Sequence, residues 1–481
     1  MAGIKKNFVY QSIYQITTII LPLITSPYIA RVLGANGVGI YSYTYSIAYY
    51  FSLFALLGIA NHGNRTIAIH RDDPDELSKA FSALMVAHCT MSIIAILAYY
   101  LYVALYVTED KSCFLVQGLW VISSLFDVSW FYFGLEQFKL TVIRSTVIKI
   151  IMTIAVFIFV RTNNDVWIYS LIMAGGTFLS QAVLWPFLRK NVKWCKVSWS
   201  GVRQHIKPLL VLFIPSIAVS LYKYMDKIML GIMTSKTEVG FYENSERAIN
   251  IPVSLINSFG MVMLPKMSNL LTKGDGKKGK EYIASSMELV MCLACAMTFG
   301  MCGVADNFSV LFWGKEFISS GSILKILSIT IYFVAFANVL RTQFLIPVAK
   351  NGLFVTSVCI GAAINLAANS LAIPYLGPYG AATGTVFAEI SVCVVQAIGC
   401  RNELSIKRYM AESAPFLIFG LLMFGVVRCI DYLVVSNFWA LILQISIGAM
   451  VYLLCCFTYF KKTDNRIALG IINLFLSKVK R

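Results

Sequence analysis

Fourteen apolar runs, each about 20 residues long, follow one another along this chain and constrain its fold more than any other feature. The hydrocarbon core of a bilayer is about 30 Å thick, a distance that about 20 helical residues cross. A membrane β-barrel would instead show alternating segments of about 10 residues. The sequence therefore predicts an all-α integral membrane protein with about 14 transmembrane helices. The runs lie near residues 8–30, 38–60, 80–106, 113–134, 142–160, 166–188, 208–232, 247–271, 282–304, 319–347, 353–373, 379–400, 413–434 and 438–460.

The composition agrees with a protein that lies almost wholly in the membrane. Of the 481 residues, 58% are hydrophobic and 13% are charged, which is about half the charged fraction of an average soluble domain. The first run contains Pro22 and Pro27 and lacks a small-residue cleavage site. We therefore interpret it as a retained helix rather than a signal peptide.

Cysteine and histidine give no sign of a metal or redox centre. The nearest approach to a motif is C-x-x-C at Cys292 and Cys295, inside an apolar run without a second pair or nearby histidines. Small buried residues are the better interpretation. We expect the four histidines to stand apart from one another (His62, His70, His88 and His205). Since no nucleophile and base form a recognisable pattern, we expect no catalytic residues, no metal and no enzyme activity.

Basic residues gather on alternate connections between the runs, as the positive-inside rule describes for cytoplasmic loops. When cations close to a run's end are counted with the adjoining connection, 28 of the 40 Lys and Arg residues belong to one side, six to the other, and six to the runs themselves. We therefore expect both termini to be cytoplasmic. The formal net charge of +17 then reflects this bias and attraction to anionic lipid. Nucleic-acid binding is not expected, because no soluble domain displays a basic face.

Two similar stretches indicate an internal duplication. Residues 33–41 read LGANGVGIY and residues 230–242 read LGIMTSKTEVGFY, each where the first helix of a group of six ends and a Gly-rich bend re-enters the membrane. The alternative is that both are merely common loop chemistry. Because each group holds an even number of runs, the repeat is parallel, and two such lobes enclose a central cavity. The expected domains are an N-lobe with helices 1–6 (1–200), a C-lobe with helices 7–12 (201–405), and helices 13 and 14 with a cytoplasmic tail (406–481).

Cations inside the runs mark a candidate site. Each charge at mid-membrane costs roughly 2.5–3.5 kcal/mol even on the mildest scale, yet six cations fall within runs: Lys149, Lys223, Lys227, Arg247, Lys325 and Arg341. Snorkelling to the interface is the alternative for the cations near outer ends, which are Arg31, Lys227, Arg247 and Lys325. Lys149 and Lys223 lie deeper, and this favours a polar cavity.

Polar stripes accompany these cations. Gln11, Gln15, Thr18, Pro22 and Thr25 lie on one face of the first run, and in hydrocarbon such a face must meet protein or water. Hydrogen bonding between helices explains the Asn, Ser and Thr positions equally well. The surplus of intramembrane cations over anions implies an anionic substrate and disfavours cationic drugs. A phosphate or pyrophosphate group suits several Lys and Arg side chains.

Five stretches of the chain carry a resemblance to a known family. They read ITSPYIARVLGANGVGIYSY, DVSWFYFGLEQFKLTVIRSTVIKI, YMDKIMLG with VGFYENSERAINIP, VMLPKMSNL, and NLAANSLAIPYLGPYGAATGTVFAE. The more specific features are the paired bends and a W-F-x-x-G-x-E-x-F-K motif, formed by Trp130, Phe131, Gly134, Glu136, Phe138 and Lys139. Over nearly its whole length the sequence resembles the O-antigen and polysaccharide flippases of the multidrug/oligosaccharidyl-lipid/polysaccharide exporter superfamily.

The resemblance implies a two-lobed transporter of the bacterial inner membrane. Such a protein would move undecaprenyl-pyrophosphate-linked oligosaccharide repeat units, of O-antigen or a related polysaccharide, to the periplasmic leaflet by alternating access. A cationic cavity between the lobes would take the pyrophosphate-sugar head. By position, the candidates for this cavity are Arg31, Lys149, Lys223, Lys227, Arg247 and Arg341.

The resemblance also bears on cofactors and partners. No cofactor is expected, but coupling to an H⁺ or Na⁺ gradient is implied for relatives, and the best acids for it here are Asp127, Asp226 and Glu389. The expected partners are the lipid-linked glycan, membrane lipid, and the polysaccharide polymerase and chain-length machinery.

Three other functions remain as alternatives. A multidrug antiporter of the same superfamily predicts an acid-dominated cavity, which the cation surplus opposes. A flippase for lipid II, the peptidoglycan precursor, shares the fold and the charge requirement, so only the resemblance separates it. A membrane polysaccharide polymerase or ligase needs a sizeable periplasmic loop with catalytic residues, whereas the outer connections here are short.

The topology can be tested on the basic loop over residues 273–280. Single cysteines introduced there into a chain without its native cysteines should react with a membrane-impermeant maleimide only after the inner membrane is opened. The positive-inside rule requires this result, because the loop carries four lysines. Labelling in intact spheroplasts would overturn the orientation.

Overall fold

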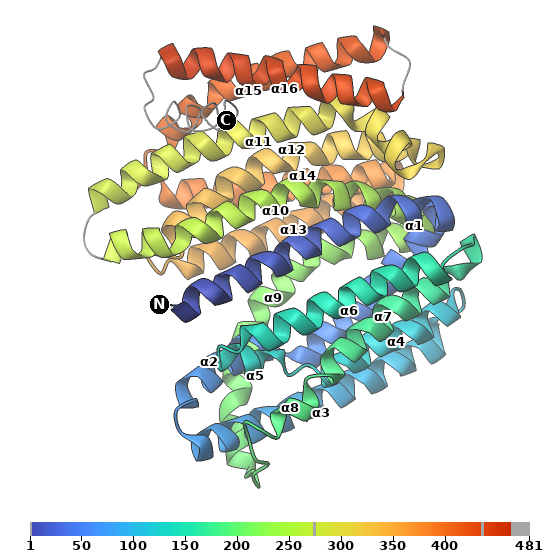
Figure 1. Cartoon of the computed structure of the whole chain (residues 1–481), viewed down its shortest axis with the longest axis vertical. Helices are drawn as coiled ribbons and strands as arrows, with labels where there is room; N and C mark the ends of the chain where they lie inside the picture. Colours follow the sequence, from blue (N-terminus) through green and yellow to red (C-terminus); the bar gives the residue numbers. More distant parts are fainter. Residues whose placement is uncertain (1, 273–275, 434–436, 463–481) are drawn as a thin grey trace. The chain divides into compact units, whose positions relative to one another are not determined.

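Helices form the whole architecture of the described residues, which are 2–272, 276–433 and 437–462 of this computed structural model (Figure 1). The side chains of Gln11 and Gln15, and the tail expected after Lys462, lie outside the described residues. Thirteen helical stretches are long and apolar enough to cross a membrane, and the first of them, Ile20–His70, has 51 residues. At about 1.5 Å per residue, that stretch is long enough for two crossings. The expected all-α membrane fold with about 14 transmembrane helices is confirmed.

The chain divides into two compact units, and unit 1 ends at Gly240. Within it α1 packs against α3, α4, α6 and α9, and α7 packs against both α4 and α6, so that α4, α6 and α7 run side by side (Figure 1). Its helices are α1 (Ala2–Leu56), α2 (Ile59–His70), α3 (Pro74–Tyr106), α4 (Lys111–Leu125), α5 (Ser129–Gly134), α6 (Phe138–Phe159), η1 (Asn163–Asp165), α7 (Val166–Ala182), α8 (Trp185–Leu188), α9 (Trp199–Met233) and the start of α10 (Lys236–Thr272).

Unit 2 begins at Phe241. Its helix α11 packs against α12, α15 and α16, and α14 packs against α12 and α13. Besides the rest of α10 it contains α11 (Gly276–Trp313), η2 (Lys315–Phe317), α12 (Ile318–Leu340), η3 (Arg341–Leu345), α13 (Asn351–Leu376), α14 (Pro378–Cys400), α15 (Ile406–Leu433) and α16 (Phe438–Lys462). The lobe boundaries expected near residues 200 and 405 stay predictions.

Both Gly-rich bends lie where the repeat predicts them. Helix α1 breaks at Gly34, whose φ of 69° lies in the left-handed region that glycine adopts without a Cβ penalty. The corresponding break separates α9 from α10. There the Lys236 Nζ donates a 3.0 Å hydrogen bond to the Gly231 carbonyl and lies 3.3 Å from the Tyr43 ring centroid. This lysine thus satisfies a carbonyl that the end of α9 would otherwise leave unpaired.

The helices that follow the two bends touch through glycine. A Cβ added to Gly39 would lie 1.6 Å from the Lys236 carbonyl oxygen, and one added to Gly240 would lie 1.9 Å from the Ala35 carbonyl oxygen. The two contacts are reciprocal, because Gly39 and Gly240, like Ala35 and Lys236, are 201 residues apart. Equivalent positions of the two repeats therefore meet at backbone-to-backbone distance, which only glycine allows.

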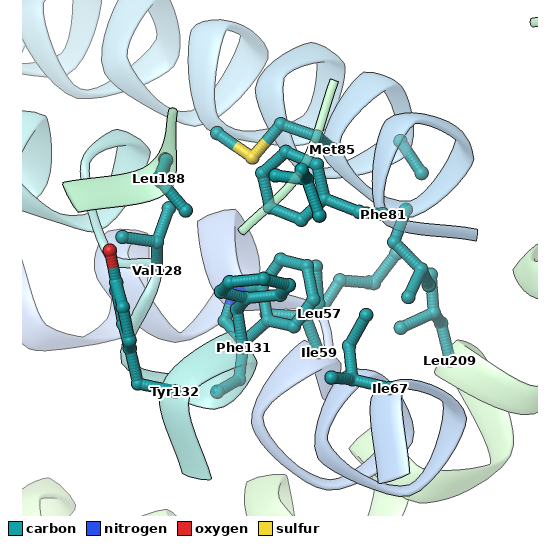
Figure 2. Packing of buried hydrophobic residues seen from close by; sticks show 14 of the residues in the cluster. Leu57, Ile59, Ile67, Phe81, Met85, Val128, Phe131, Tyr132, Leu188 and Leu209 are labelled. Carbon is teal, nitrogen blue, oxygen red and sulfur yellow. The ribbon is translucent and has the colours of Figure 1, made fainter. Parts of the chain in front are cut away.

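The W-F-x-x-G-x-E-x-F-K motif packs α5 closely against α2. Trp130 lies so close to Gly63 that a Cβ there would be 2.5 Å from the indole ring, and Gly134 meets Ile67 in the same way at 2.7 Å. Figure 2 shows Phe131 and Ile67 in the apolar cluster that this contact helps to close.

An ion pair closes the other end of the motif. Arg71 donates a 2.7 Å hydrogen bond to Glu136, and this bond raises the pKa of Arg71. Glu136 has a positive φ of 58°, so the pair holds the turn that leads into α6.

A charged network joins α15 and α16 to the rest of unit 2. Asp306 of α11 accepts hydrogen bonds from Lys325 of α12 at 2.5 Å and from Arg428 of α15 at 2.8 Å. Arg428 also pairs with Asp431 at 2.9 Å, and Gln444 of α16 donates to Asp431 at 3.1 Å. Lys325 is therefore ion-paired within the protein rather than held by snorkelling alone. Two cations and two acids balance, and the network fixes α15 and α16 to α11 and α12.

The reciprocal glycine contact predicts how the fold responds to one methyl group. Gly39→Ala should lower the thermal unfolding midpoint by several degrees, because overpacking costs about 1–3 kcal/mol and the opposing atom is backbone. Gly175→Ala is the matched control, since nothing lies within 4 Å of a Cβ at that helical glycine. Tryptophan-fluorescence melts in detergent compare the two. Equal midpoints would show that the bends are not in contact.

Candidate functional site

Lys149 lies against the first half of α1. Its Nζ donates a 2.8 Å hydrogen bond to the hydroxyl of Thr18, and α1 and α6 pack together. The sequence places Thr18 on the polar stripe of the first run and Lys149 near mid-depth of the fifth, so two separate predictions meet in one contact. A hydroxyl orients the ammonium group but supplies no counter-charge.

Lys223 and Lys227 lie beside an aromatic cluster formed by α1 and α9. Their Nζ atoms are 5.6 and 5.3 Å from the centroid of the Tyr224 ring, within the range of a cation–π attraction. Tyr224 in turn lies 4.0 Å from Tyr49 and 6.0 Å from Tyr45, centroid to centroid. The Tyr224 ring thus interacts with the ammonium groups of both lysines.

Sequence reasoning missed this aromatic cluster, although a signal was present. Tyr41, Tyr45 and Tyr49 recur at intervals of four and so share one helical face. Trp120 of α4 completes the cluster edge-on to Tyr45, at 4.8 Å.

The four cations that unit 1 contributes differ in exposure. Lys223 is exposed, whereas Lys227 is 6% and Asp226 is 1% exposed. Arg31 is exposed on α1, three residues before the Gly34 bend. The buried Asp226 and Lys227 are sequence neighbours on α9, whereas Lys223 and Arg31 are the more exposed cations.

Acids are scarce on the helices that carry these cations. The sequences of α1 and α6 contain no Asp or Glu, and α9 contains Asp226 alone. Helix α1 packs against both other helices. On these three helices the four candidate cations outnumber the single acid, which favours a positive field around them.

The candidates in unit 2 have closer partners. Arg247 forms a 2.7 Å ion pair with Glu243 one turn away on α10, as its sequence spacing suggests. Arg341 donates to Asn257 Oδ1 at 3.3 Å, and its guanidinium lies 5.7 Å from the Phe354 ring centroid. Arg341 starts the π-helical turn η3, a distortion that is frequent at functional sites.

The three acids proposed for ion coupling lie in different surroundings. Asp127 accepts a 2.9 Å hydrogen bond from the Ser129 backbone N–H and a second one from the Ser129 hydroxyl. These bonds stabilise the turn before α5. Glu389 of α14 is half-buried and interacts electrostatically with Arg341, while Asp226 is buried. Their coupling roles stay predictions.

Two histidines expected to stand apart are in contact, and this expectation was wrong. His62 Nε2 and His205 Nδ1 lie 2.9 Å apart, which joins α2 to α9. The residues are 143 positions apart in the chain, and neither run contains a pattern that points to the other.

The C-x-x-C pair belongs to a helix interface. Cys295 is buried, and Cys292 Sγ lies 3.7 Å from Cys456 Sγ of α16. Within the described ranges no three His, Cys, Asp or Glu side chains are placed to hold a metal ion.

Comparison with known sequences gives three informative matches. A family model described as "Polysaccharide biosynthesis protein" matches residues 4–271. A "Putative O-antigen transporter" of Shigella dysenteriae is 22% identical over 393 residues, 81% of this chain and 98% of the relative. A "Probable low-salt glycan biosynthesis flippase Agl15" of Haloferax volcanii is 24% identical over 291 residues, 60% of this chain and 61% of the relative.

Solved structures share the fold. "Lipid II flippase MurJ, inward closed conformation" has a TM-score of 0.74 at 17% identity, covering 95% of this chain and 99% of that chain. An inward-facing multidrug resistance MATE family transporter has a TM-score of 0.56 at 13% identity, covering 81% of this chain and 99% of that chain. At these identities the likeness concerns the fold alone.

The ion pair between Arg247 and Glu243 predicts that Arg247 contributes to the stability of the fold. In a double-mutant cycle of Glu243→Gln and Arg247→Gln, we expect a coupling of about 1–2 kcal/mol, because removing one partner leaves the other charge uncompensated. Chemical unfolding in detergent measures it.

The matched control is Arg408–Glu412, another pair with i,i+4 spacing whose arginine is 68% exposed. Its coupling should stay near 0.3–0.5 kcal/mol. If the changes in unfolding free energy of the two single variants simply add in the double variant, the ion pair does not stabilise the fold.

Proposed function

The chain belongs to the polysaccharide biosynthesis protein family, and from this premise we propose that it is a flippase for lipid-linked glycan. The proposed substrate is an undecaprenyl-pyrophosphate-linked oligosaccharide repeat unit of O-antigen or a related polysaccharide. We place the protein in a bacterial inner membrane with both termini cytoplasmic, and the direction of transport from the cytoplasmic to the periplasmic leaflet. The named relatives, an O-antigen transporter and a glycan flippase, support this assignment.

One observation carries the proposal more than any other. Helices α1, α6 and α9, of which α1 packs against the other two, carry the candidate cations Arg31, Lys149, Lys223 and Lys227 and the single acid Asp226. A positive field inside a membrane protein is costly, and a pyrophosphate group would compensate it. Lysine and arginine are the residues that bind phosphate oxygens through charge-assisted hydrogen bonds.

The proposed mechanism separates the two ends of the substrate. Arg31, Lys149 and Lys223 bind the pyrophosphate, and Lys227 extends the cationic surface within unit 1. Arg247 and Arg341 of unit 2 stay candidates from the sequence alone. The polyprenyl chain stays in the hydrocarbon of the bilayer throughout, so the protein need not shield it from water. Alternating access then follows from rocking of the two repeats about their common axis, and protonation or Na⁺ binding at Asp226, Asp127 or Glu389 drives it. Catalysis is not part of this mechanism.

A lipid II flippase is the second candidate function. It shares the fold and the need for cations that bind a pyrophosphate. The same cations would serve both head groups, so the sugar rather than the phosphate distinguishes them. A multidrug antiporter is disfavoured, because cationic drugs would be repelled by the four cations of unit 1.

The test is a glycan assay in a strain that lacks the chromosomal copy. Lys149→Ala and Lys223→Ala should each lower surface glycan roughly tenfold at unchanged protein level, since losing a hydrogen bond to a charged group costs about 1.5–3 kcal/mol. Lys280→Ala, an exposed lysine of the α11 start, is the control and should leave glycan unchanged.

Two results would decide against this function. Wild-type amounts of surface glycan in both lysine variants would show that transport does not require the cationic site. Rescue of a strain depleted of its peptidoglycan-precursor flippase, without an effect on surface glycan, would favour the second function.

A further inference from the structure

A groove of about 730 Å³ lies on unit 1 beside the first half of α6. Ile143 and Val147 of α6, and Val183 and Phe187 from the segment around α8, form its apolar walls. These four side chains are between 37% and 48% exposed. The groove is therefore open, and in a membrane-spanning segment an open apolar wall is covered by hydrocarbon rather than water.

Two cations line the groove from α6. Lys139 lies in the first turn of α6 and is exposed, and Arg144 lies about one and a half turns further on, next to Ile143. Arg144 is held in place by a 2.9 Å hydrogen bond to Gln181 Oε1. The nearby acid Glu136 is ion-paired with Arg71, so the groove mouth carries net positive charge.

The length of the groove matches one leaflet. From Lys139 to Ile148, the last groove residue on α6, the helix rises about 14 Å at 1.5 Å per residue. Half of a hydrocarbon core of about 30 Å is about 15 Å. A charged end at the membrane surface and an apolar channel one leaflet deep are the shape of one lipid molecule.

We propose that this groove binds an anionic phospholipid of the leaflet in which α6 begins. The phosphate lies between Lys139 and Arg144, and one acyl chain runs along Ile143, Val147 and Val183. A phospholipid fits better than a polyprenyl lipid, whose much longer chain would leave a groove that is one leaflet deep. This inference rests on the groove alone and does not depend on the proposed transport activity.

Native mass spectrometry of the purified full chain tests the proposal, with phosphatidylglycerol or phosphatidylethanolamine added. Wild type should retain phosphatidylglycerol selectively. Lys139→Gln should weaken that retention roughly fivefold, as expected for one cation at a lipid surface. Val147→Trp fills the groove without changing charge and should remove both lipids.

Lys190→Gln is the matched control, since Lys190 is an exposed lysine after α8 that does not line the groove; it should behave as wild type. Size-exclusion profiles confirm that each variant is folded. Equal retention of both lipids in all variants would overturn the proposal. Preferential retention of a polyprenyl phosphate in competition, lost in Val147→Trp, would also overturn it and assign the groove to that lipid.

Discussion

Inside a bilayer no water solvates the backbone, so every N–H and C=O must be bonded within the protein. Helices meet this demand everywhere except where the chain turns back into the membrane. In this protein two such turns, at Gly34 and between α9 and α10, bring the following helices together through Gly39 and Gly240. The close approach leaves no space for lipid or a side chain between the two backbones. The repeat is thus visible in the sequence because its equivalent positions must both be glycine to touch.

Charge is handled differently in the two units. In unit 2, Asp306 binds both Lys325 and Arg428, and Arg247 is paired with Glu243. Such pairs lower the cost of burying charge but leave little net field for a ligand. In unit 1, Lys149 donates to a hydroxyl and Lys223 lies beside an aromatic ring. This contrast supports the proposal that the phosphate binds in unit 1, and the ion pair gives Arg247 a structural role in unit 2.

The sequence predicted local properties well and distant pairings poorly. Apolar runs, bends and basic loops are properties of short stretches, so the helices and the breaks at Gly34 and before Lys236 could be found without a structure. Contacts between helices depend on how far each helix is rotated about its axis, and periodicity gives this only roughly. The Lys149–Thr18 contact agrees with the polar stripe of the first run, which must face protein or water, whereas the His62–His205 contact lacks any such stripe. For Lys325, snorkelling stayed open as an alternative in the sequence, because its acid, Asp306, lies in the preceding helix.

The most recognisable motif of the chain does not lie among the candidate substrate residues. Trp130 and Gly134 pack against α2, and Glu136 holds its turn through Arg71. That turn sets where α6 begins, and it therefore sets the height of Lys139 at the groove mouth and, three helical turns further on, the depth of Lys149 beside Thr18. A motif can thus be specific for a family because it fixes the depth of a helix in the membrane. Lys149, proposed to bind the substrate, then lies at a fixed distance from this turn along α6.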